Sequence, residues 1–167
     1  MLWLRQNFQS NGGCRMKLAE ALAERKTLQQ KVKEVSERAN DAVRVQGGDA
    51  PPEPVDALLR DLASALEALE VLTVRINRTN VAARLSTGET IMEAIARRDR
   101  LRAMHAVLRA AADAGHTPRE RWGRQEIRYV ATVDVAQLRR RVDEGAKRYR
   151  DLDTALQAVN WQVELAE

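Results

Sequence analysis

Amide and hydroxyl side chains occupy positions of this sequence where a helix would be expected to bury leucine. The first of them lie around the stretch 75–80, "RINRTN", inside a long pattern that is otherwise apolar. A polar residue on a helix seam fixes register or oligomeric state at some loss of stability, and an amide buried without a partner costs about 1–3 kcal/mol. We therefore predict a polar seam that sets register or, alternatively, a small ligand pocket between helices. Its residues are Thr73, Asn77, Asn80, His105 and Tyr149.

Arginine is the other residue type that could do chemistry here, because its guanidinium group recognises phosphate with two parallel hydrogen bonds. The segment 49–70 has six acidic residues and one arginine, a net charge of −5, whereas 75–109 has eight arginines and three acidic residues, a net charge of +5. Opposite blocks of charge can pair within the chain or between subunits. If the protein binds nucleic acid, the arginines predicted to contact phosphate are Arg75, Arg78, Arg97, Arg98 and Arg102.

The sequence has no recognisable catalytic or metal-binding motif. His105 and His116 are not spaced as metal ligands, and the single cysteine, Cys14, excludes an intramolecular disulfide. No serine lies in a nucleophile elbow, and no glycine-rich phosphate loop occurs. We therefore expect no catalysis, no metal and no cofactor.

The composition is that of long helices. Apolar residues make up 44% of the chain but aromatic residues only 4%, as in helical bundles and coiled coils. No apolar run reaches the roughly 20 residues of a membrane span, and no signal peptide is recognisable. We expect a cytoplasmic protein that does not contact membranes, at a length for which a single domain is usual.

The first fifteen residues, "MLWLRQNFQSNGGCR", differ from the rest of the chain, since they contain the only Cys and Phe and no acidic residue. The codons of Gly12-Gly13 can contain a ribosome-binding sequence at a suitable distance before the codon of Met16. We therefore expect a native start at Met16. In this interpretation 1–15 is a translated leader or a cloning-derived extension, and 16–167 is one helical-bundle domain.

Four helical patterns position the candidate residues, at 18–45, 55–85, 90–114 and 134–163. The predicted starts of the third and fourth are capping-box pairs, Thr90 with Glu93 and Asp134 with Gln137. The segment between them, around 119–133, is irregular or forms a short extended element. We predict an all-α, antiparallel four-helix bundle with coiled-coil character.

Two of the helices carry strict heptads, which predict long left-handed seams. In the second helix the predicted seam alternates Leu59, Leu66, Thr73 and Asn80 with Leu62, Leu69, Ile76 and Ala83. In the fourth it alternates Val135, Val142, Tyr149, Leu156 and Val163 with Leu138, Gly145, Leu152 and Val159. Two such seams and the large apolar surfaces of Trp122 and Trp161 favour a homo-oligomer, with the tryptophans at the interface.

Several motifs together resemble a family of small bacterial helical proteins labelled septicolysin-like. They are "MKLAEALAERKTLQQKV", "RINRTN", "EAIARRD", "EIRYVATVDVAQL" and "DLDTALQAVNWQVEL", in that order along 16–165. The resemblance implies a helical fold and a homo-oligomer, and it supplies no catalytic residue. The lytic activity that the label suggests is not expected, because the sequence has no secretion signal and no membrane span.

Two functions are compatible with these observations. The first is a cytoplasmic, homo-oligomeric helical scaffold or interaction protein without catalysis. The alternative is a helical nucleic-acid-binding protein that uses the arginine-rich faces of the second and third helices. The two differ in salt dependence, because phosphate binding weakens steeply as salt rises.

Overall fold

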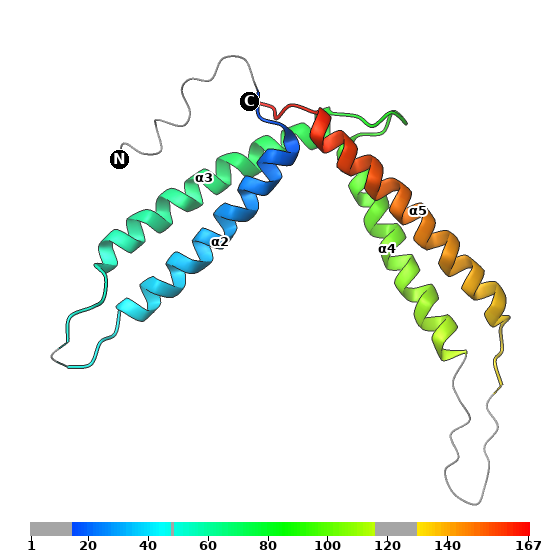
Figure 1. Ribbon diagram of the computed structural model, residues 1–167, viewed down its shortest axis with the longest axis horizontal. Coiled ribbons are helices and arrows are strands. Elements are labelled where there is room, and N and C mark those ends of the chain that lie inside the picture. Colours follow the sequence, from blue (N-terminus) through cyan, green and yellow to red (C-terminus); the bar gives the residue numbers. More distant parts are fainter. Residues whose placement is uncertain (1–14, 48, 116–129) are drawn as a thin grey trace, which may run out of the picture. The chain divides into compact units, whose positions relative to one another are not determined.

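Four long helices make up most of the described chain. The computed structural model describes residues 15–47, 49–115 and 130–167. The helices are α2 (Leu18–Ala42), α3 (Val55–Ala82), α4 (Ile91–Ala114) and α5 (Val135–Gln162). They pack as two antiparallel hairpins, α2 with α3 and α4 with α5 (Figure 1). The prediction of an all-α helical bundle is thereby confirmed.

The chain divides into two compact units. The first contains α2, α3 and the C-terminal residues 160–167, and the second runs from Arg84 to Val159. A compact unit is not necessarily a separately folding domain. The single domain predicted over 16–167 therefore stays a prediction. The predicted extension 1–15 lies outside the described residues except for Arg15, and most of the predicted irregular segment 119–133 lies outside them as well. The described part of that segment, 130–133, is neither helix nor strand.

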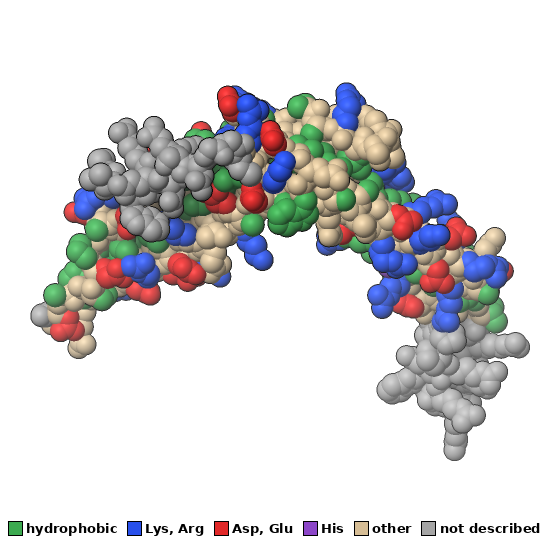
Figure 2. Space-filling model, turned by 45° about the horizontal axis from the view of Figure 1, so that its top comes forward, with side chains coloured by type: hydrophobic (Ala, Val, Ile, Leu, Met, Phe, Trp, Pro, Cys, Tyr) green, Lys and Arg blue, Asp and Glu red, His purple; other side chains and the backbone are tan. Residues whose placement is uncertain are grey.

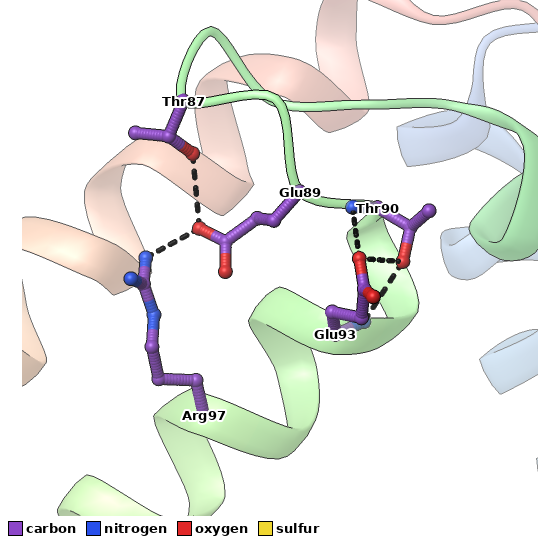
Figure 3. Close-up of polar contacts among 5 residues, drawn as sticks. All are labelled: Thr87, Glu89, Thr90, Glu93 and Arg97. Carbon is purple, nitrogen blue, oxygen red and sulfur yellow. Dashed lines mark hydrogen bonds and ion pairs between the residues drawn. The ribbon is translucent and has the colours of Figure 1, made fainter.

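The start of α4 shows how the local sequence sets a helix boundary. The Thr90 N–H donates to Glu93 Oε2 at 2.7 Å, and the Glu93 N–H donates to Thr90 Oγ1 at 3.2 Å, as the capping-box pattern predicts (Figure 3). The backbone N–H of Thr90, and then its hydroxyl, hold the pKa of Glu93 below its ordinary value. Gly88, with φ of 90°, makes the tight turn before this cap. In α5 the Gln137 N–H donates to Asp134 Oδ1 at 2.9 Å.

The predicted α3 heptad is correct at one of its two positions. Ile76 is 0% exposed and Leu62 packs against the buried cluster, as predicted. At the other position the buried residues are Leu58, Ala65 and Leu72, one residue earlier than predicted. The predicted seam residues Leu59 and Leu66 are 50% and 47% exposed. Both lines have seven-residue spacing, so periodicity alone does not separate them. The buried line is the one whose residues pack closely against small side chains of α2, such as Ala39 and Ala42.

The second hairpin has a looser seam. The predicted α5 heptad is its inward face, since Leu152 and Leu156 are buried and the remaining heptad positions are half-buried. On α4, buried residues lie at the two ends, Ile91 and Ala94 at one and Ala112 at the other. Between them the seam positions Leu101, His105 and Leu108 are only half-buried. Small residues on α5 therefore leave space beside the middle of α4.

No helix in the described parts of the chain is both long and apolar enough to cross a membrane.

Candidate functional site

The stretch "RINRTN" holds the C-terminal segment against α3. Arg75 Nε donates to the Ala166 carbonyl at 2.8 Å, and Arg78 donates to the Glu167 carbonyl at 3.1 Å. Thr79, only 2% exposed, donates to the Arg75 carbonyl and accepts from the Ala166 N–H, both at 2.9 Å. Two of the five arginines predicted to contact phosphate, Arg75 and Arg78, thus bind the end of the chain. Thr79, which lies between the two asparagines, binds it as well.

The same C-terminal segment pairs with the start of α2. The Leu18 N–H donates to the Val163 carbonyl at 2.9 Å, and the Leu165 N–H donates to the Met16 carbonyl at 2.8 Å. Leu18 and Leu165 are both buried, at 0% and 4% exposure. We call this arrangement of 15–18, 163–167 and the end of α3 the terminal clasp. It gives Thr79, a buried polar residue near the end of α3, its hydrogen-bond partner.

The predicted polar seam is distributed over both hairpins. Thr73 and Asn80 are half-buried and Asn77 is exposed, all on the outer side of α3. His105 and Tyr149 are half-buried on α4 and α5. The threonine and the asparagines continue a line that we call the outer line of α3, which has regular 4-3 spacing: Leu59, Ala63, Leu66, Glu70, Thr73, Asn77 and Asn80. One position of the predicted heptad, Leu59, Leu66, Thr73 and Asn80, thus lies on this second face, whereas Leu62 and Ile76 of the other position lie in the seam.

The remaining candidate arginines differ in their partners. Arg97 forms an ion pair with Glu89, which also accepts from the Thr87 hydroxyl (Figure 3). Arg98 pairs with Asp99 at 3.0 Å and with Asp153 of α5 at 3.6 Å. Arg102 makes no such pair with any residue that the structure describes. Four of the five predicted phosphate contacts are thus engaged within the chain.

Arg102, His105 and Tyr149 come together in one cavity of the second hairpin. The cavity has a volume of about 380 Å³, and its lining is completed by Ala146 and Arg150. Two smaller cavities adjoin His105, of about 190 and 350 Å³. A Cβ atom at Gly145 would lie 4.0 Å from the Cβ of His105, so glycine at this seam position adds to the open space. We call the 380 Å³ space the α4–α5 cavity.

Other candidates are on the surface or outside the described chain. Trp161 is 65% exposed, which leaves its ring available to a partner, and Trp122 lies outside the described residues. Within the described ranges no group of three or more His, Cys, Asp or Glu residues is arranged to hold a metal ion. Arg38 joins α2 to Glu53 before α3, and this hydrogen bond holds the pKa of the Glu53 carboxyl below its ordinary value.

Two residues of these sites were not predicted. Thr79 is buried because the chain end folds onto it, and its bond to Ala166 joins residues 87 apart in the sequence. Arg150 lines the α4–α5 cavity because it lies four residues after Ala146, one helical turn along the same side of α5. Residues 141 and 148 are also arginines, so the composition of this helix gave no reason to select Arg150 among them.

The described part of the chain is all-α and consists of two antiparallel helical hairpins. The chain belongs to a family of unknown function, DUF6847, whose pattern matches residues 25–165. It is similar to a solved structure from Corynebacterium diphtheriae, described as a functionally unknown conserved protein. The two are 38% identical, the match covers 91% of this chain and 99% of the other, and the TM-score is 0.85. No curated protein matches the chain.

These comparisons correct the resemblance drawn from the sequence motifs. The matching family is DUF6847 and the structural relative is functionally unknown, and neither points to a septicolysin-like family. The quoted motifs are mostly amphipathic helical stretches. Such stretches share composition and periodicity across unrelated helical proteins, which is why they misled the assignment.

Proposed function

We propose that this protein is a homo-oligomeric helical scaffold or interaction protein of the cytoplasm, without catalysis. The observation that supports this proposal is the outer line of α3. It keeps 4-3 heptad spacing over seven positions, although α2 packs against a different line of the same helix. A partner helix that covers Leu59 and Leu66 would remove their exposed apolar surface from water.

The chemistry of the outer line fits a second copy of the same chain. Leu59 and Leu66 are about half exposed at its N-terminal end, and they supply apolar area. Thr73, Asn77 and Asn80 follow at its C-terminal end, where amides can fix register between copies. A symmetric antiparallel pair with its two-fold axis at Leu66 would bring the two Leu66 side chains together and would place Leu59 beside Thr73.

Nucleic-acid binding is less well supported. Four of the five candidate arginines already have carboxylate or carbonyl partners in the chain. On the face drawn in Figure 2, basic and acidic side chains are interspersed over the helices. A mixed surface of this kind is typical of a solvated interaction protein, whereas nucleic-acid binders concentrate basic residues on one face.

Light scattering coupled to size exclusion tests the proposal. We expect wild-type protein at micromolar concentration to have a mass of at least twice the 18.8 kDa of one chain. The substitution Leu66→Glu should give the mass of a single chain, because it places charge in the apolar part of the outer line. Val71→Glu is the matched control, since Val71 is 60% exposed on the other side of α3. A wild-type mass of one chain would overturn the proposal.

A further inference from the structure

We propose that the α4–α5 cavity binds a small anion that carries a phosphate group. The cavity belongs entirely to the second hairpin, and no residue of the outer line of α3 lines it. Its volume of about 380 Å³ falls in the range of small-molecule sites, which is roughly 300–1,000 Å³. The proposal is independent of self-association.

The polar residues that line the cavity are all able to donate hydrogen bonds. Arg102 and Arg150 contribute guanidinium groups, Tyr149 a phenolic O–H and His105 a ring N–H. Guanidinium groups match phosphate oxygens with paired, charge-assisted hydrogen bonds. None of these four side chains makes a hydrogen bond or ion pair with another residue in the described parts of the chain.

The absence of carboxylates from the lining separates this cavity from its neighbours. The 190 Å³ cavity contains Glu144, and the 350 Å³ cavity contains Asp113 and Asp143. A carboxylate would repel a phosphate and would neutralise the arginines beside it. The α4–α5 cavity is therefore the one of the three whose charge suits an anion.

The helices place the backbones of these donors around one space, with Arg102 and Arg150 exposed and His105 and Tyr149 half-buried. Arg102 and His105 are three residues apart on α4. On α5, Tyr149 and Arg150 follow Ala146 by three and four residues. This spacing places each group on one helix face, and the hairpin turns the two faces toward each other. Ala146 contributes only a methyl group to the α5 wall of this cavity, and Gly145 lines the adjoining 190 Å³ cavity.

A small ligand fits these observations better than a nucleic acid does. The four donors converge from two helices on one space, and Arg97 and Arg98, nearer the start of α4, are paired with carboxylates. The geometry thus favours a single phosphate group, either free or at the end of a small metabolite.

Calorimetric titration of the full-length chain with inorganic phosphate and with adenosine monophosphate tests the site. We expect saturable binding of at least one probe. The double substitution Arg102→Gln, Arg150→Gln should weaken it about a hundredfold or more, because it removes both groups that form charge-assisted hydrogen bonds. The control Arg60→Gln, Arg140→Gln removes the same charge outside the cavity and should change affinity less than about twofold.

Tyr149→Phe provides a second variant, which keeps both arginines and the shape of the cavity. It should weaken binding about threefold to tenfold through loss of one O–H donor. Circular dichroism should show wild-type helix content in every variant. The proposal is overturned if neither probe binds saturably, or if the control lowers affinity as much as the cavity variant. Binding of single-stranded DNA with a steep salt dependence, but of neither small probe, would replace it with nucleic-acid recognition.

Discussion

Leu165→Ala should lower the free energy of unfolding by about 2–5 kcal/mol, the usual range for truncating a buried leucine. Leu165 is 4% exposed although only two residues follow it in the sequence, and its N–H donates to the Met16 carbonyl. Its loss leaves a cavity in the terminal clasp and loosens the segment that Arg75, Arg78 and Thr79 bind. Urea denaturation followed by circular dichroism measures the change.

Glu167→Ala is the control for the terminal clasp. The Glu167 side chain is exposed, while its backbone carbonyl, which accepts from Arg78, is kept. This substitution should change the free energy of unfolding by less than about 0.5 kcal/mol, as is usual at the surface. If Leu165→Ala has as small an effect as Glu167→Ala, the clasp does not stabilise the chain as described.

Leu58→Ala should destabilise the protein by about 2–5 kcal/mol, and Leu59→Ala should destabilise it far less at low protein concentration. Leu58 is 3% exposed and packs in a cluster with Val35, Ala39 and Ala42, whereas Leu59 is 50% exposed on the outer line. The two substitutions remove the same atoms from adjacent residues. Their difference therefore measures which line is the seam of the hairpin.

Protein concentration separates the two leucines further. The effect of Leu58→Ala should be independent of concentration, because the contact lies within one chain. The effect of Leu59→Ala should increase with concentration, because stabilisation by a partner subunit follows mass action. Equal losses for both variants at every concentration would refute the assignment of the seam to the line that contains Leu58.

Local signals in the sequence predicted the helices well. The capping pair Thr90 and Glu93 is present at the start of α4, and Asp134 caps α5. These features depend on residues within one turn of each other, so spacing alone determines them. The α5 heptad was predicted in the correct register, since it has no competing line of apolar residues.

Longer-range features could not be predicted in the same way. On α3, the lines through Leu58 and Leu59 have the same period, and only the packing of α2 selects between them. Thr79 resembled any helical threonine, because its partner Ala166 is remote in sequence. His105 and Tyr149 were selected from periodicity, but their position in one cavity depends on how α4 and α5 are aligned.

The central claim is that the outer line of α3 joins two copies of this chain, and disulfide cross-linking tests it most directly. In a Cys14→Ser background, Leu66→Cys places the only thiol near the middle of the outer line. Val71→Cys places it roughly 140° away around the same helix. Mild oxidation should convert the Leu66→Cys protein to a covalent dimer much faster than the Val71→Cys protein. Equal rates, or no dimer from either protein, would contradict the claim.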